Sequence, residues 1–167
     1  MGFLSVSASG GLKNKSCVSK YTPIAADVVG GILWVCDSLN HRVVGYSSLV
    51  SSSISATRVI GQPNFVSGDA GVASNRLNTP SGVSSDGMRF FVSDAGSSRV
   101  VVLESVPQIA GPNFDAILGQ SSSSGSQANR GQSTPTETTL SDPAGCYFDG
   151  RSLYVVDRGN SRIVRFR

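Results

Sequence analysis

The residues best suited to chemistry in this chain are three aspartates, each followed five positions later by an arginine. Each pair lies in a similar stretch that begins with a proline fourteen residues before the aspartate. Carboxylates at such positions could act as general acids or bases, or could bind a metal ion together with further ligands. A turn-forming role explains the repetition better, because every copy of a repeated unit needs the same turn, whereas one active site suffices. The residues assigned to this structural role are Asp37, Asn40, Arg42, Asp94, Arg99, Asp157, Asn160 and Arg162.

Each residue type has an expected task in such a turn. We expect the aspartate, at the end of a strand, to accept hydrogen bonds from the N–H groups of the turn that follows. The asparagine is expected to adopt the left-handed conformation that a tight reversal requires. We expect the arginine to bridge to the aspartate or to a neighbouring copy of the repeat.

Other catalytic or metal-binding residues are scarce. His41 is the only histidine, which excludes a metal site built on two histidines, and its place in a turn predicts exposure to solvent. Glu104 and Glu137 are the only glutamates, and no pattern places either of them in a metal site. The odd number of cysteines and the absence of a CxxC motif predict neither a zinc site nor a complete set of disulfides. We therefore predict no catalytic residue, metal or cofactor. The sequence leaves open whether a disulfide forms between any two of Cys17, Cys36 and Cys146.

The positive charge of the chain is concentrated at its C-terminal end. Residues 151–167 hold five arginines and one acidic residue, whereas the rest of the chain is close to neutral. Arginines interleaved with apolar residues are found in nucleic-acid-binding proteins. Solvated arginines on an outer strand explain the pattern better, so nucleic acid is the less favoured partner. The arginines considered for binding are Arg158, Arg165 and Arg167.

The three stretches form an internal repeat, which decides the fold class. Pro23–Val44, Pro80–Val101 and Pro143–Val164 align without a gap, and their starts are 57 and 63 residues apart. Each copy predicts a short strand, a glycine turn, a strongly apolar second strand and a third strand that begins at the arginine. A fourth strand is predicted twice, at residues 56–62 and 114–120, and both end in Gly-Gln. The second strands are expected to be central and buried on both faces: Leu33–Asp37, Phe90–Asp94 and Leu153–Asp157.

Four short antiparallel strands repeated in tandem are typical of a β-propeller blade. The proline, the Asp-Gly turn, the apolar strand ending in aspartate, the Asp157–Ile163 turn (DRGNSRI) and the trailing Gly-Gln together resemble the NHL-repeat family. The middle copy departs from the pattern, with Ser97 in place of the asparagine. The resemblance implies an all-β fold, a partial β-propeller of three four-stranded blades of which the third is incomplete. The divisions it implies are an N-terminal strand and linker (1–22), blade 1 with its loop (23–79), blade 2 with its loop (80–142) and a partial blade 3 (143–167).

Three blades cannot close a ring, because propellers have typically four to eight. Phe3–Val6, followed by SASGG, parallels the predicted fourth strand AILGQSSSSG, so we expect it to complete a blade begun by other residues. Two chains could form a six-bladed ring, or the chain could be a piece of a longer protein; the second arrangement is favoured.

The expected function is that of a non-catalytic scaffold, which presents polar loops to a protein partner or self-associates to complete the propeller. The polar loop 121–142 and its shorter counterpart 63–79 are the expected contact segments, although the Ser/Gly-rich composition of loop 121–142 also fits a flexible spacer. One alternative is a fragment of a metal-dependent propeller lyase or lactonase, and another is RNA binding through the basic third blade. No membrane span is predicted. The serine-rich composition and a glycosylation sequon at Asn14 favour an extracytoplasmic or surface location.

Overall fold

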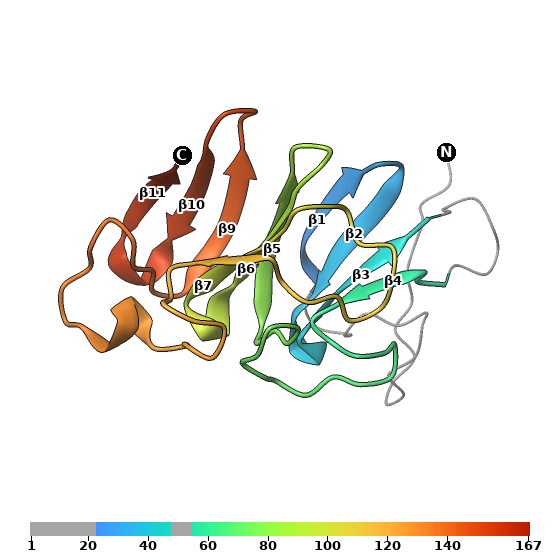
Figure 1. The fold of residues 1–167 in the computed structure, drawn as a ribbon, viewed down its shortest axis with the longest axis horizontal. Helices are drawn as coiled ribbons and strands as arrows, with labels where there is room; N and C mark the ends of the chain where they lie inside the picture. Colours follow the sequence, from blue (N-terminus) through green and yellow to red (C-terminus); the bar gives the residue numbers. More distant parts are fainter. Residues whose placement is uncertain (1–22, 48–54) are drawn as a thin grey trace.

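The structure of the chain, a computed structural model, describes residues 23–47 and 55–167, and this part of the chain contains strands and short 3-10 turns but no α-helix. Its strands form three antiparallel sheets that lie side by side (Figure 1). The all-β prediction is therefore confirmed.

Sheet 1 consists of β1 (Pro23–Val29), β2 (Ile32–Asp37), β3 (Arg42–Tyr46) and β4 (Arg58–Ile60). Sheet 2 consists of β5 (Pro80–Ser85), β6 (Phe90–Asp94), β7 (Arg99–Leu103) and β8 (Ala116–Leu118). Sheet 3 consists of β9 (Pro143–Phe148), β10 (Leu153–Asp157) and β11 (Arg162–Phe166).

Each sheet follows the chain order, so consecutive strands are hydrogen-bonded neighbours. The first two strands are joined by tight turns in which the glycine supplies a positive φ, for example +90° at Gly87 and +94° at Gly150. In two of these turns, an aspartate precedes the glycine and accepts N–H groups of the turn. The Oδ1 of Asp86 accepts the N–H of Met88 at 2.9 Å, and the Oδ1 of Asp149 accepts those of Arg151 and Ser152 at 2.8 and 2.7 Å. This Asx geometry explains why Asp-Gly marks the turn in the sequence.

The second and third strands are joined by three equivalent 3-10 turns: η1 (Ser38–Asn40), η2 (Ala95–Ser97) and η4 (Arg158–Asn160). A fourth 3-10 segment, η3 (Ala128–Gly131), lies in the loop between sheets 2 and 3. The first strands extend further than the sequence suggested, since each includes its initial proline, and the fourth strands are shorter. The strand predicted at Phe3–Val6 lies outside the described residues, and within them sheet 3 has three strands.

Apolar side chains hold the three sheets together in the order 1, 2, 3. Trp34 of sheet 1 meets Phe90 of sheet 2, with ring centroids 4.8 Å apart. Phe91, on the opposite face of sheet 2, stacks on Phe148 of sheet 3 at 5.4 Å. Complete burial of such a side chain contributes about 1.5–3 kcal/mol, so these apolar contacts stabilise both interfaces between the sheets.

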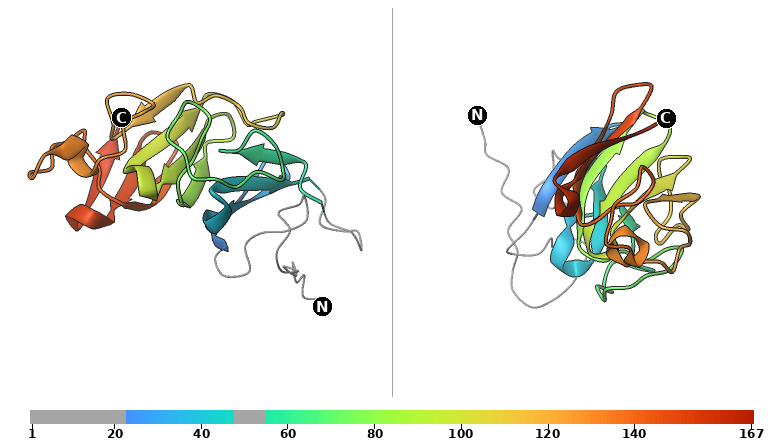
Figure 2. Two further views of the ribbon diagram at one scale, coloured as in Figure 1. Left: turned by 90° about the horizontal axis from the view of Figure 1, so that it is seen from below. Right: turned by 90° about the vertical axis from the view of Figure 1, so that its left-hand side faces the viewer.

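The expectation that every second strand is buried on both faces is correct for β6, only partly correct for β2, whose Leu33 and Val35 are half-buried, and wrong for β10. All residues of β6 are buried, because sheet 2 lies between the other two sheets. Sheet 3 lies at one end of the row (Figures 1 and 2), and only one of its faces meets sheet 2. Val156 of β10 and Ile163 of β11 are therefore 46% and 68% exposed.

Candidate functional site

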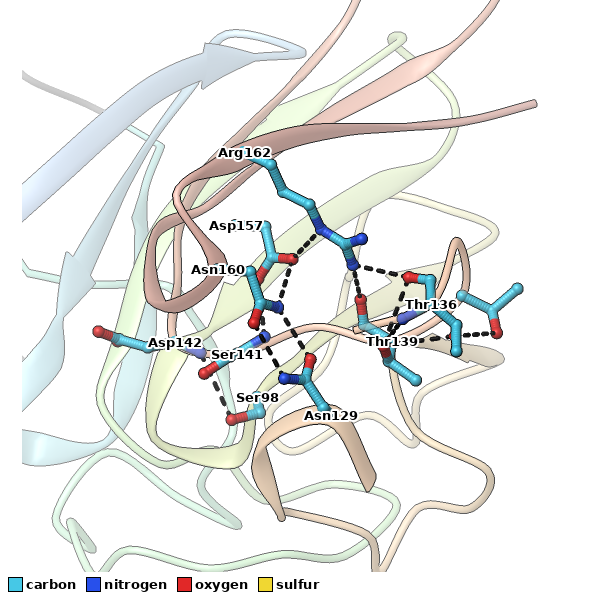
Figure 3. A network of polar contacts seen from close by, with 10 residues as sticks. Ser98, Asn129, Thr136, Thr139, Ser141, Asp142, Asp157, Asn160 and Arg162 are labelled. Atoms are coloured by element: carbon cyan, nitrogen blue, oxygen red, sulfur yellow. Dashed lines mark hydrogen bonds and ion pairs between the residues drawn. The ribbon is translucent and has the colours of Figure 1, made fainter. Parts of the chain in front are cut away.

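The third aspartate lies at the centre of a network of polar contacts that joins sheet 3 to the preceding loop (Figure 3). The Oδ2 of Asp157, which is fully buried, accepts hydrogen bonds from the Nε of Arg162 and the Nδ2 of Asn160, both at 2.7 Å. Its Oδ1 accepts the backbone N–H of Ser141 at 2.7 Å. The amide of Asn160 also exchanges two hydrogen bonds with the amide of Asn129, at 2.8 and 2.9 Å. Both oxygens of the Asp157 carboxylate therefore accept hydrogen bonds that join sheet 3 to the loop before it.

The same arrangement occurs in the other two sheets, and we refer to the pairs Asp37–Arg42, Asp94–Arg99 and Asp157–Arg162 as the Asp–Arg clasps. The Nε–Oδ2 distances are 2.7, 2.8 and 2.7 Å, respectively. The first two pairs are fully buried, whereas the Arg162 side chain is 28% exposed. In sheet 1, Asn40 donates to both carboxylate oxygens of Asp37 at 3.0 Å.

The arginine of each clasp also binds a loop next to its sheet, and Arg99 binds both the loop that enters its sheet and the loop that leaves it. Arg99 donates to the carbonyl oxygen of Arg76, in the loop before sheet 2, at 2.7 Å. It also donates to that of Ser123, in the loop after sheet 2, at 2.6 Å. Arg42 donates in the same way to the carbonyl of Phe65, which is three residues beyond the first Gly-Gln pair, as Ser123 is beyond the second. A guanidinium group has five donors, which suits this use at a junction of several segments.

The clasps differ from the expected turn geometry in two ways. Asp94 and Asp157 accept the N–H of a residue in the preceding loop, 16 positions earlier in both cases, instead of one in the following turn. The left-handed conformation is adopted by the residue after the asparagine position, with φ of 51° at His41, 48° at Ser98 and 52° at Ser161. The asparagines therefore contribute as hydrogen-bond donors to the aspartate.

His41 was expected to face solvent, and this expectation is wrong. The residue is half-buried, and its Nδ1 accepts the backbone N–H of Thr79 at 3.0 Å. Ser98 occupies the equivalent position in sheet 2, and its hydroxyl accepts the N–H of Asp142 at 3.4 Å. Both contacts join a turn of one sheet to the residue that precedes the proline of the next sheet.

The two Gly-Gln pairs have a structural task that their residue types alone do not predict. In the structure, the Nε2 of Gln62 donates to the carbonyl oxygens of His41 and Asp69, both at 2.9 Å. The Nε2 of Gln120 donates to the equivalent carbonyls of Ser98 and Gln127, at 3.0 and 2.8 Å. Each glutamine is buried and joins the end of its sheet's 3-10 turn to the loop leaving that sheet.

The loops between the sheets are thus fixed by contacts at several points. Loop 121–142 is held by Gln120 and Arg99, and also by Arg130, which donates to the carbonyls of Gly119 and Thr138 at 3.2 and 3.1 Å. Leu140, near the end of this loop, is fully buried between sheets 2 and 3, and Leu77 occupies the equivalent place between sheets 1 and 2. This pattern does not fit the flexible spacer that the Ser/Gly-rich composition of loop 121–142 suggested.

Burial perturbs two titratable groups near the clasps. It raises the pKa of Asp94 to about 6, although the Arg99 guanidinium and the N–H of Asn78 oppose the shift. Burial also raises the pKa of the Cys36 thiol far above its ordinary value, with smaller contributions from Cys146 and Asp37. A thiol held protonated in this way is a poor nucleophile.

A cavity of about 370 Å³ opens where the three 3-10 turns converge. Its charged groups are Asp142 and Arg158, which pair with each other at 2.8 Å. In the described ranges 23–47 and 55–167, no group of three or more His, Cys, Asp or Glu side chains is placed to hold a metal ion. The cavity is lined by Ser38, Thr79, Ser81, Ala95, Gly96, Asp142, Ala144 and Arg158.

The arginines considered for nucleic-acid binding do not form one patch. Arg158 lies in η4, at the end of sheet 3 where β10 leads into β11. Arg165 lies near the other end of β11, and Arg167 follows that strand. Glu104 and Glu137 are both exposed and lie outside the cavity lining. The sequon at Asn14 lies outside the described residues.

Comparison with known proteins supports the fold alone. No protein-family model and no curated protein matches the chain. Among the solved structures that do match, hydrazine synthase from Kuenenia stuttgartiensis is 14% identical, with a TM-score of 0.50. The match covers 98% of this chain, which spans 38% of the length of the hydrazine synthase chain. None of the helices in the described part of the chain has the length and apolar character that a membrane crossing requires.

Proposed function

We propose that the chain is a non-catalytic β-propeller module of the NHL type, which acts as a protein-interaction or structural scaffold within a larger ring or assembly. The observation that carries this proposal is the use of the three Asp–Arg clasps. Their carboxylates and guanidinium groups make hydrogen bonds that join the sheets and loops of the chain, and the side-chain amides of Gln62 and Gln120 do the same. The residues that repeat most faithfully are therefore those that build the module.

The arrangement of the sheets supports the propeller as the architecture of this module. Each complete sheet has four antiparallel strands in chain order, and the first strand of sheet 2, β5, lies against both β1 and β9. Propeller blades share this strand order, with their first strands innermost. The three clasps are also equivalent to one another, so the sheets resemble each other in how their turns and loops are joined as well as in their strand order.

A calorimetric titration with Zn²⁺ and Ca²⁺ tests the scaffold against the metal-dependent lyase or lactonase. We expect no saturable binding, because the only charged groups lining the cavity, Asp142 and Arg158, neutralise each other. Stoichiometric binding of either ion, together with turnover of a lactone or a peptidyl-hydroxyglycine, would replace the scaffold by an enzyme.

A salt titration tests the RNA-binding alternative. Contacts to phosphates weaken steeply with salt, with a slope that reports the number of contacts. Since Arg158 lies at the opposite end of β11 from Arg165 and Arg167, we expect weak binding to a single-stranded RNA and no change beyond about twofold when all three are replaced by alanine together. A loss of about a hundredfold in affinity in this triple variant would favour RNA binding instead.

A further inference from the structure

The turn of sheet 1 is joined to the start of sheet 2 through an imidazole ring. The Nδ1 of His41 accepts the backbone N–H of Thr79 at 3.0 Å, and the hydroxyl of Ser38 donates to the carbonyl oxygen of Pro80. Pro80 is the first residue of β5, so both hydrogen bonds tie sheet 1 to the segment that enters sheet 2. We call the contact between His41 and Thr79 the first junction. Since Nδ1 is an acceptor, the neutral imidazole carries its proton on Nε2.

The equivalent contact between sheets 2 and 3, the second junction, has a hydroxyl group as its acceptor. Here the hydroxyl of Ser98 accepts the backbone N–H of Asp142 at 3.4 Å. His41 and Ser98 have the same left-handed backbone conformation, with φ of 51° and 48°, so the two turns present their side chains alike. Histidine is the side chain that ordinarily changes charge between about pH 5 and 8, whereas a serine hydroxyl stays neutral there. The chain thus contains a titratable and a non-titratable form of one contact.

The donor of the first junction is held in a strained conformation. Thr79 has a φ of 51°, a left-handed value that β-branched residues rarely adopt. Asp142 has a φ of 49° at the second junction, but aspartate tolerates this conformation because of its short polar side chain. A strained residue keeps its conformation only while the surrounding contacts hold it there. The first junction therefore combines a strained donor with an acceptor that a proton can remove.

Uptake of a proton at Nδ1 turns the acceptor of the first junction into a donor. Two N–H groups then point at each other, and the half-buried backbone N–H of Thr79 loses its partner. The hydrogen bond from Ser38 to Pro80 contains no titratable group and remains. Protonation of His41 therefore weakens the link between sheets 1 and 2 at the residue where the backbone is strained.

The charged groups on the elements around the first junction are mostly bound to one another. The loop between the two sheets contributes Arg76, which donates to Gln62 at 2.7 Å, and the exposed Asp69. Asp94 accepts the N–H of Asn78, and burial raises its pKa to about 6, so its titration has to be separated from that of His41. The ion pairs are Asp37 with Arg42 in sheet 1, Asp94 with Arg99 in sheet 2, and Asp142 with Arg158 at the cavity that Thr79 also lines.

We propose that His41 makes the junction between sheets 1 and 2 a pH-sensitive contact, which weakens when the imidazole takes up a proton at Nδ1 and releases the strained backbone at Thr79. The second junction keeps its hydroxyl acceptor at Ser98 and is insensitive to the same change in pH. Mild acidification therefore loosens the attachment of sheet 1 and leaves that of sheet 3 unchanged. The proposal concerns the connections within the module and does not rest on the scaffold function.

Amide hydrogen exchange of the full chain, followed by NMR at about pH 7.5 and pH 5 and corrected for the intrinsic effect of pH on exchange, tests the first junction. We expect the protection of the Thr79 amide to fall on the order of tenfold at the lower pH, because one hydrogen bond is lost. The protection of the Asp142 amide, measured in the same sample, should change by less than about twofold. His41 is the only histidine, so its imidazole signals need no assignment and report the protonation of the ring directly.

His41→Ser is the matched variant, because serine occupies the equivalent positions 98 and 161 with nearly the same φ. It should keep an acceptor for Thr79 and abolish the fall in protection at low pH. Asp94→Asn removes the other titrating group and should leave the size of that fall unchanged.

Three outcomes would overturn the proposal: equal protection of Thr79 at both pH values, the same fall in His41→Ser as in the intact chain, or an equal fall at Asp142. If His41→Ser fails to fold, the comparison of the two amides in the intact chain decides the matter. The fall at Thr79 must then follow the protonation of the imidazole, and a fall that follows another pH midpoint would reject His41 as its cause.

Discussion

Replacing Arg99 by alanine should be among the most damaging single changes in the chain. The substitution leaves the carboxylate of Asp94 fully buried without its cationic partner, and it also removes the donors to the carbonyls of Arg76 and Ser123. Breaking a buried ion pair by removing one partner costs about 3–5 kcal/mol. Since a domain of this size is stable by only about 5–15 kcal/mol, much of the folded state's margin would be lost.

Arg162→Ala is the matched control because it breaks the same clasp in sheet 3. The Arg162 side chain is 28% exposed, whereas that of Arg99 is fully buried. Water can therefore reach the carboxylate of Asp157 once the arginine is gone, and we expect a cost of about 1–2 kcal/mol. The difference between the two variants measures the effect of burial at nearly constant contact geometry.

Urea denaturation of both variants at pH 7.5 and pH 5 provides the assay. The pKa of Asp94 is already about 6 in the intact protein, so at pH 5 the group is largely neutral and the loss of its cationic partner should cost less than at pH 7.5. Equal costs for Arg99→Ala and Arg162→Ala, or a cost for Arg99→Ala that does not fall at pH 5, would refute the reasoning.

Three further predictions concern single residues. The folded state holds the proton of Asp94 more tightly than the unfolded chain does, and this difference stabilises the folded state. The stabilisation is complete below the ordinary pKa of 3.8 and is lost as the pH rises through about 6. Asp94→Asn should therefore remove this part of the pH dependence of the urea midpoint. Gly119→Ala should cost about 2–4 kcal/mol in thermal denaturation, since its φ is +94° and a Cβ would lie 2.8 Å from Leu140. Gly150→Ala, with the same φ and nothing within 4 Å of a Cβ, should cost only about 1 kcal/mol, and equal costs would contradict the packing argument. Gln120→Leu should cost about 2 kcal/mol and speed hydrogen exchange in the loop that follows, because two carbonyls lose their donor; unchanged exchange would show that the loop is held without it.

The repeat in the sequence is sufficient to predict the sheets and much of the strand order, because strand residues and turn residues recur at fixed spacing. The third strands, which begin at Arg42, Arg99 and Arg162, start where the sequence analysis placed them. The partners of the clasps are harder to predict. Asp94 binds the N–H of Asn78, and any non-proline residue offers an N–H, so no residue type marks the contact.

The hydrogen bonds of Gln120 and the exposure of one face of β10 could not be predicted from the sequence, and the two failures have related causes. Gln120 is visible as a repeated residue, but its acceptors are backbone carbonyls, which leave no trace in the sequence. The apolarity of β10 predicted burial on both faces, because a sequence shows that a face is apolar but not whether another sheet covers it. Val156 and Ile163 are exposed because, among the described residues, no other sheet packs on the face of sheet 3 that turns away from sheet 2.

Hydrogen exchange at the amides of Asn78 and Ser141 tests most directly the central claim that the repeated aspartates and arginines hold the module together. These two N–H groups donate to the buried carboxylates of Asp94 and Asp157, at 2.6 and 2.7 Å. The account predicts that both amides, although they lie in loops, exchange only through large-scale opening and as slowly as the amides of β6. Exchange of either amide at the rate of an unstructured peptide would contradict it.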